Sequence, residues 1–488
     1  MENTPFEDIN VNLPILRGRN RDLFMSGGLG TGAIKLLSTD VVGSGLKLKV
    51  VLDNEALDIT EEQATNWARD VEKRFAIWAN SKDCCISGLN NFYELQRLSY
   101  LASLINGDSI ILITYNEHNE LTLNVIESDR VSTPTNLKTY GYGDTFSGIK
   151  RLENGNYIES GIEKTPKGKV VAIYVQSDEN GKTEWSRHEV RNKVSGLPNV
   201  LINFTPERPN QTRGVPFLSS AITTLKQMEE YIEADLESTI INSKIGVIFH
   251  LDDELDNPFS ATGSSLNEDD VETFGQKKNR VKKYKIDTGA VLTLGKEDKV
   301  TFADPNKPKM SFESFITTLT KVIGSTLEIP AEVLIKSFNS NYSASRASLN
   351  SHWQVVKNKR MNFISDFCQP IYEIWLFQQI STGVIKAPKY LDSKYYAKLW
   401  SGAEWIGSSL SSIDPLKEVS AAAMRVENGF STRSKEAMEM TGTDFFVNAK
   451  IRKREEEELK ALQLKGGEEN EQRQEQEQNR EQESDDTN

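Results

Sequence analysis

The chain has 488 residues and a net charge of −13, and 37 % of its residues are hydrophobic. This length and composition are typical of a globular protein with two or three packed units. No run approaches the roughly eighteen apolar residues of a membrane span, and the start of the chain lacks a secretion signal, so we expect neither insertion nor secretion. The three cysteines, Cys84, Cys85 and Cys368, offer no disulfide framework, which suits a reducing cytoplasm.

The negative charge is concentrated at the C-terminus. Residues 466–488 carry nine Asp or Glu against two Arg, a net charge of −7, which leaves −6 for the residues before them. This tail contains no apolar residue, so we expect it to be disordered. A protein that grips nucleic acid tightly through phosphate contacts usually has a basic surplus. The body of this chain should therefore touch DNA only locally or let it slide past.

The first half of the chain predicts a mixed helix and strand unit. The glycine-rich GLGTG at 28–32 matches neither a dinucleotide-binding motif nor a P-loop, so a flexible turn is favoured over a phosphate cradle. Helices are expected over 60–80, opened by Thr60, and over 92–105, ended by Asn106-Gly107. Asn-Gly pairs at 154 and 180 mark turns. Strands are expected over 46–52, 109–115, 121–126, 170–175 and 183–185.

One long amphipathic helix follows the loop FTPERPNQTRGVP. Gly214 allows a tight turn and Pro216 is tolerated in a first helical turn, so the helix should begin near Phe217. At about 39 Å it is too long for a small domain, so it should pack against another long element or a neighbouring copy of itself. Its apolar residues form one stripe: Leu218, Ile222, Leu225, Met228, Ile232, Leu236 and Ile240.

The rest of the chain begins with an acidic segment after Phe249, which we call the excursion and expect to be an exposed loop. Strands are expected there over 291–294 and 299–302, followed by helices over 311–327 and 344–380, the second bent by Pro370. Short helices continue to the tail. The excursion contains a basic run: Lys277, Lys278, Arg280, Lys282, Lys283 and Lys285. A solvated face is the favoured interpretation of this run, and a contact with nucleic acid or an acidic partner is the alternative.

No pattern in the sequence indicates catalysis or a cofactor. The histidines at 118, 188, 250 and 352 are scattered, and we expect each to lie on a surface or helix face. The acidic pairs at 252–253 and 269–270 fall in the excursion, where solvated charge is a better explanation than a two-metal site. The chain is therefore expected to act through shape and assembly.

The loop RPNQTRGVP and the helix that follows it resemble a signature of the lambda-type bacteriophage portal proteins. The family's R-x-x-Q-x-R-G-V-P loop, followed by a helix with a Tyr-x-x-Ala-Asp-Leu pattern, matches Arg208, Gln211, Arg213, Gly214, Val215, Pro216, Tyr231, Ala234, Asp235 and Leu236. LRGRNRDLF, NGD, NYSASRASL and SIDPLKEVS resemble other family segments in the same order. The resemblance covers roughly residues 15–464. Gly27 to Gly30, where the family has a polar stretch, and the spacing of WIGSSLSSIDP depart from the pattern.

The resemblance implies an α+β portal-type fold, with long stem and wing helices, a small α/β clip insert and a mainly helical C-terminal region, assembled as a ring. The implied parts follow in chain order. They are a flexible N-terminus (1–16), an α/β wing region (17–215), a stem helix (216–248), the clip insert (249–310), a second stem helix (311–329), a channel-proximal loop (330–346), a long kinked wing helix (347–383), a crown-like helical region (384–465) and the disordered acidic tail (466–488).

The resemblance also implies a function and partners. Portal proteins form a ring, usually of twelve copies, at one capsid vertex of the virion; the terminase large subunit pumps double-stranded DNA through the ring's channel without sequence specificity, and the ring joins head to tail. Adaptor, major capsid and scaffold proteins are further implied partners, and synthesis takes place in the host bacterial cytoplasm. No cofactor and no membrane is implied.

The resemblance also gives candidate contact residues. The basic run Lys277, Lys278, Arg280, Lys282 and Lys283 would meet the motor or DNA, and Asn339, Asn341, Tyr342 and Arg346 would form the channel loop. Arg208 and Arg213 would make either a subunit contact or a local loop anchor. Two other function classes stay open from the sequence: a nuclease or ATPase of the packaging machinery, and a capsid-assembly scaffold without a channel.

Overall fold

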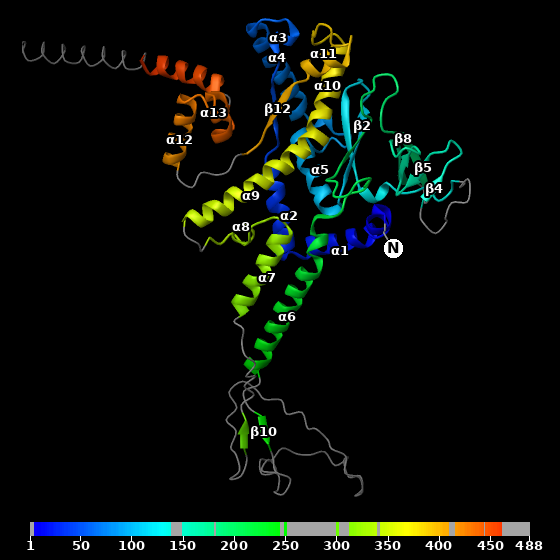
Figure 1. Cartoon of the computed structure of the whole chain (residues 1–488), viewed down its shortest axis with the longest axis vertical. Coiled ribbons are helices and arrows are strands. Elements are labelled where there is room, and N and C mark those ends of the chain that lie inside the picture. The colour runs from blue at the N-terminus through cyan, green and yellow to red at the C-terminus, as the bar shows by residue number, and fades with distance from the viewer. Residues whose placement is uncertain are drawn as a thin grey trace, which may run out of the picture. The chain divides into compact units, whose positions relative to one another are not determined.

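The computed structural model describes residues 4–137, 149–179, 182–244, 248–250, 299–301, 312–338, 342–408, 415–443 and 445–460. The chain divides into two compact units, one formed by Met1–Leu225 with Thr320–Asn488 and the other by Lys226–Leu319. The predicted α+β fold class is confirmed, and Figure 1 shows both kinds of element in the first unit.

The first unit begins with a helical segment where a flexible N-terminus was predicted. A π-helical turn, Phe6–Asn10, precedes α1 (Leu13–Ser26) and α2 (Gly28–Val41). The flexible prediction for residues 1–16 is wrong for this part, because Phe6, Ile9 and Leu13 are buried. The turn predicted at GLGTG is also wrong, since α2 contains it. The chain turns where α2 begins, at Gly27 and Gly28, whose φ angles of 92° and 75° favour glycine.

Two antiparallel sheets form the β part of the first unit. Strands β2 (Ser109–Tyr115), β3 (Leu121–Ile126) and β9 (Val200–Asn203) pair in the order β3-β2-β9. A five-stranded meander contains β4 (Ile149–Arg151), β5 (Tyr157–Glu159), β6 (Ile162–Lys164), β7 (Val170–Glu179) and β8 (Lys182–Glu189). Apolar side chains of both sheets share one buried cluster: Ile110, Leu112, Ile126, Val131, Ile162, Ile173, Val175 and Val200. This shared core fixes the sheets together.

The two helices predicted over 60–80 and 92–105 are present, and each begins at a capping residue. Thr60 forms a capping box with Gln63 at the start of α4 (Glu61–Asn80), and Asn91 forms one with Glu94 at the start of α5 (Phe92–Asn106). Short α3 (Asn54–Leu57) precedes them. Both helices contribute rings to a buried aromatic cluster: Phe75, Trp78, Phe92, Phe367, Tyr372, Trp375 and Trp405. Edge-to-face pairs at 5.2–5.9 Å hold Phe75 in its centre.

The long helix predicted from residue 344 is present and starts slightly earlier. Helix α9 (Tyr342–Phe363) continues through a π-helical turn, Ile364–Cys368, into α10 (Gln369–Ser381), and Figure 1 shows them as one rod. The π turn ends two residues before Pro370, whose ring and missing N–H prevent regular α-helical bonding. The preceding stretch, predicted as a loop up to residue 346, contains α8 (Ala331–Leu334) and the first turn of α9.

The C-terminal region contains a strand that the helical prediction missed. Strand β12 (Ala403–Ile406) follows α11 (Lys394–Trp400) and pairs antiparallel with β1 (Lys47–Val50). Helices α12 (Pro415–Glu427) and α13 (Arg433–Thr441) come next, and residues 445–460 are also helical. Pro415 is the first residue of α12, and Asn428-Gly429 directly follows its last residue.

The second unit is built around two helices. A 3-10 turn (Phe217–Ser220) of the first unit precedes α6 (Ile222–Lys244), so the α-helix starts five residues later than predicted. Beyond Leu225, Tyr231 of α6 packs on Phe312 and Phe315 of α7 (Phe312–Thr326), with ring centroids 5.9 and 4.3 Å apart. Strands β10 (Ile248–His250) and β11 (Lys299–Thr301) pair antiparallel. The strand predicted over 291–294 and the 466–488 tail lie outside the described residues.

Candidate functional site

The loop that precedes α6 is folded by its own glutamine. The Gln211 side-chain oxygen accepts hydrogen bonds from the backbone N–H groups of Glu207 and Arg208 at 2.8 and 3.0 Å, and its amide nitrogen donates to the Arg213 carbonyl oxygen at 2.9 Å. Arg208 is half-exposed and forms an ion pair with Asp8 at 2.6 Å. The loop is thus tied both to itself and to the N-terminal segment.

Arg213 is buried at the junction of the loop, the sheets and the helical N-terminus. Its guanidinium is 1 % exposed and donates five hydrogen bonds, two of them to the Asp108 carboxylate at 2.6 and 3.1 Å. The other three go to the carbonyl oxygens of Ser128, Val131 and Ser160 at 2.8–2.9 Å. All donors of the guanidinium are therefore satisfied within one chain.

Asp108 connects this arginine to a second one. Arg17 of α1 donates to the same carboxylate at 3.0 Å, at the Oδ1 atom that Arg213 also binds, and it binds Asp129 at 2.9 Å. The backbone N–H of Gly214 donates to Asp108 as well, at 3.2 Å. Burial alone would raise the pKa of Asp108, but the charge and hydrogen bonds of Arg213, together with Arg17, outweigh burial and lower the pKa below its ordinary value. The carboxylate therefore stays ionised in the core.

Two motif glycines let the backbones of this junction approach closely. A Cβ atom added to Gly214 would overlap the carbonyl oxygen of Gly107, and one added to Gly107, whose φ is 91°, would overlap the backbone of Gly214. The sequence predicted a tight turn at Gly214. The structure shows a different reason for glycine there, because two loops far apart in the chain pack backbone against backbone.

Gly214→Ala is expected to destabilise the fold by about 1–3 kcal/mol, because the added methyl group must displace the 107–108 backbone. Urea unfolding followed by circular dichroism would measure the change. Gly18→Ala is the matched control: nothing lies within 4 Å of its added Cβ on α1, and helix propensity predicts a gain of up to about 1 kcal/mol. Equal stabilities of the two variants would contradict the close-packing interpretation.

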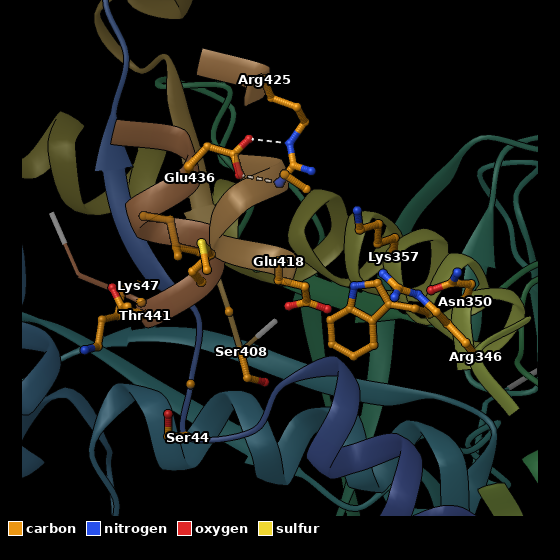
Figure 2. Close-up of a pocket in the computed structure, with 17 residues that line it drawn as sticks. Ser44, Lys47, Arg346, Asn350, Lys357, Ser408, Glu418, Arg425, Glu436 and Thr441 are labelled. Carbon is orange, nitrogen blue, oxygen red and sulfur yellow. Dashed lines mark hydrogen bonds and ion pairs between the residues drawn. The ribbon is translucent and has the colours of Figure 1, made fainter. Parts of the chain in front are cut away.

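A second feature of the first unit is a polar pocket of about 830 Å³ beside α9 (Figure 2). One wall is a single face of α9, and α12 and α13 form the opposite wall. The turn after α2, β1 and the end of β12 complete it. The charged and polar lining residues are Ser44, Lys47, Arg346, Asn350, Lys357, Ser408, Glu418, Arg425, Glu436 and Thr441. Arg425 pairs with Glu436 through two hydrogen bonds at 2.6 and 2.9 Å.

Some of the predicted contact residues lie in the loop junction or in the pocket beside α9. The others lie outside the described residues. Arg208 and Arg213 belong to the loop junction, and Arg346 lines the α9 pocket. Tyr342 is the first residue of α9. Asn339 and Asn341 of the predicted channel loop, and the basic run at 277–283, lie outside the described residues.

Sequence reasoning missed the acidic partner of the junction. Asp108 is fully buried directly before the apolar strand β2, and an aspartate in the Asn-Gly-Asp segment at the start of a buried strand could have indicated a buried charge partner. In the sequence, Arg17 stands out only as part of the family-like segment LRGRNRDLF. The long-range pairing of Arg17, Asp108 and Arg213 spans about two hundred residues of sequence, which local patterns cannot reveal.

The histidines at 118 and 352 differ in their surroundings. His352 is buried on α9 and bonds Asp40 at 2.8 Å, and His118 is exposed. Within the described ranges, His, Cys, Asp and Glu side chains form no group of three or more that could hold a metal ion. No helix in the same ranges is long and apolar enough to cross a membrane.

Comparisons with known proteins define the class of this fold. A family model described as "Phage portal protein, lambda family" matches residues 2–360. The portal protein of Escherichia phage N15 is 24 % identical over 443 residues, covering 86 % of this chain and 80 % of that protein. Portal protein B of Escherichia phage lambda is 24 % identical over 488 residues, covering 95 % and 88 %. The protein is a portal protein.

The chain belongs to the lambda family of phage portal proteins, as the match over most of its length shows. Among solved structures, it is similar to the neck of a native gene transfer agent (GTA) particle computed with C12 symmetry. That similarity has a TM-score of 0.45 and 10 % identity, and covers 88 % of this chain and 92 % of the other.

Proposed function

We propose that this portal protein assembles as a closed ring of identical copies around a channel through which double-stranded DNA passes between capsid and tail. The supporting observation is the apolar face of α6. Leu218, before the helix, and Leu225 are buried, but Ile232, Leu236 and Ile240 further along the same stripe are 38, 58 and 42 % exposed. An apolar stripe left exposed on one chain is suited to burial against a neighbouring copy.

The net charge of the residues before the 466–488 tail is compatible with a channel that does not bind DNA tightly. The residues before the tail carry a net charge of −6, so they lack the basic surplus that tight phosphate binding requires. The proposed partners are the terminase large subunit as motor, head-tail adaptors, and the capsid and scaffold proteins. The proposed place of the ring is the portal vertex of the virion, after synthesis in the bacterial cytoplasm.

Within this proposal the loop arginines have local roles. We assign Arg213 to loop anchoring, because its five hydrogen bonds stay within the chain and fix the root of α6. We assign Arg208 to holding the N-terminal segment through Asp8. The channel-proximal role of residues 339–346 rests on family resemblance.

Native mass spectrometry of the purified chain tests the ring proposal. One dominant species with a fixed number of copies, expected from the family to be twelve, would support it, and a broad series of small oligomers would contradict it. The proposal also includes no catalytic role. Purified protein would be assayed for ATP hydrolysis and for metal-dependent DNA cleavage. Either activity would contradict the absence of a catalytic role if it copurified with the protein and was lost when residues of this chain were substituted.

The basic run of the insert is proposed to contact the motor or DNA. Changing Lys277, Lys278, Lys282 and Lys283 to Glu is expected to weaken motor docking and DNA packaging while ring formation is unchanged, because charge reversal repels an acidic partner. Packaging by reconstituted particles is the measurement. The matched control also reverses four charges, by changing Lys450, Lys453, Arg454 and Lys460 of the C-terminal helix to Glu. Unchanged docking and packaging in the insert variant would show that the run makes no functional contact.

A further inference from the structure

The α9 pocket carries chemistry that the portal function does not use. Arg346, Asn350, Trp353 and Lys357 follow each other on α9 at spacings of four, three and four residues, so they share one helix face. From Arg346 to Lys357 this face is about 16 Å long. Figure 2 shows the labelled members of the set on the same helix, along one side of the pocket. Cations therefore bracket an aromatic ring and an amide along one wall.

The lining is positively charged, although the chain as a whole is acidic. Lys47 from β1 adds a third cation to Arg346 and Lys357. Arg425 and Glu436 neutralise each other through their paired hydrogen bonds, so Glu418 is the one remaining carboxylate of the described lining. The surplus of cations in a concave site favours an anionic ligand.

The aromatic member of this wall is held in place from behind. Trp353 is half-buried, and the Arg360 guanidinium lies 5.4 Å from its ring centroid. Arg360 donates in turn to the carbonyl oxygens of Val41, Asp40 and Ser408 at 2.9, 2.7 and 2.8 Å. This fixed ring offers a preformed surface on which a planar group can stack.

We propose that this pocket binds a short single-stranded segment of nucleic acid, with a base stacked on Trp353 and phosphates bound by Arg346 and Lys357. The combination favours a strand over an acidic peptide, because a fixed indole between cations matches alternating bases and phosphates. A volume of about 830 Å³ admits a few nucleotides but not the width of a duplex. The inference depends on one part of the proposed function, namely that DNA passes close to this protein.

Glu418 gives the pocket an internal competitor. Figure 2 shows it directed from α12 toward the wall that carries Arg346 and Lys357. A bound phosphate would meet this carboxylate as a like charge. Removing the charge should therefore tighten binding, whereas damage to the fold would weaken it.

The test is fluorescence anisotropy of a labelled oligothymidylate of about 15 nucleotides titrated with the full-length protein at several salt concentrations. The double variant Arg346→Gln, Lys357→Gln is expected to bind about tenfold more weakly and to lower the slope of log affinity against log salt by about 1.4, roughly 0.7 for each contact. Glu418→Gln is expected to bind about threefold more tightly. The controls are Lys359→Gln on α9 and Glu427→Gln on α12, which lie outside the lining and should bind like the unchanged protein.

Three results would overturn the inference: a double variant that binds like the unchanged protein, a poly-glutamate peptide that binds as tightly as the oligonucleotide, or a duplex of the same length that binds as tightly with the same response to the variants. Thermal melting of each variant separates lost binding from lost fold. Native mass spectrometry of the same samples separates the two proposals. Rings that do not bind the oligonucleotide would overturn this inference alone. Binding of the oligonucleotide by a protein that forms no rings would overturn the ring proposal alone.

Discussion

Replacing Arg213 by alanine is expected to lower the free energy of unfolding by about 3 kcal/mol, the lower end of what breaking a buried ion pair costs. The change removes two hydrogen bonds from a fully buried carboxylate and three from backbone carbonyl oxygens. Arg17 and the Gly214 N–H still bind Asp108, which keeps the loss from being larger. Chemical denaturation would measure it.

Two variants make this result specific. Arg213→Lys keeps the charge but cannot reach five acceptors with one ammonium group, so it should recover only part of the loss. Arg208→Ala removes an arginine of the same loop whose ion pair with Asp8 is half-exposed, and should cost at most about 1 kcal/mol. If Arg213→Ala cost no more than Arg208→Ala, the junction would not be the anchor of the α6 root.

The lowered pKa of Asp108 predicts that acid weakens the same junction. A carboxyl group whose pKa is lower in the folded chain than in the unfolded chain adds stability above the unfolded value, about 4, and this stability is lost as the pH falls through the folded value. Asp108→Asn should therefore reduce stability at neutral pH and flatten its dependence on pH below about 4. Melting temperatures of both proteins across this range would show it, and parallel curves would contradict it.

Changing Ile232 and Leu236 of α6 to aspartate is expected to abolish ring formation and leave a folded single chain. Both side chains are exposed in the chain, so charge there costs little within one copy. In a closed ring every copy would bury these charges in its interface, and burying unpaired carboxylates against an apolar face is strongly unfavourable. Because each subunit carries the change, the penalty recurs at every interface.

Size-exclusion chromatography with light scattering would measure the loss of rings, and circular dichroism would confirm that the chain is folded. Glu233→Gln with Glu237→Gln is the matched control, since it alters two positions of the same helix away from the stripe and should keep the rings. Rings of unchanged size in the Ile232→Asp, Leu236→Asp variant would show that this stripe is not an interface.

Local patterns predicted several boundaries at which a cap or a turn residue decides the structure. Thr60, Gly107 and Gly155 mark boundaries that the structure confirms, because capping boxes and positive-φ glycines act through residues within a few positions. Strand β12 was missed because β1, its partner, lies about 350 residues earlier in the chain. The glycines of 28–32 suggested a turn, yet packing of α2 onto neighbouring helices overrides their weak propensity.

The candidate sites show the same limit. The motif residues Arg213 and Gly214 could be chosen from the sequence, but their roles depend on Asp108 and Gly107, which come together with them only in the fold. The α9 face was partly visible, since Arg346 was singled out, but its opposite wall comes from α12 and α13, which follow about seventy residues later. Long-range packing makes both sites, so sequence spacing alone could not define them.

Negative-stain electron microscopy of the purified protein is the most direct test of the ring proposal. The proposal predicts uniform rings with a central hole, because neighbouring copies bury the exposed stripe of α6 around a channel. A field of small particles without a hole, at concentrations where the chain is folded, would contradict it.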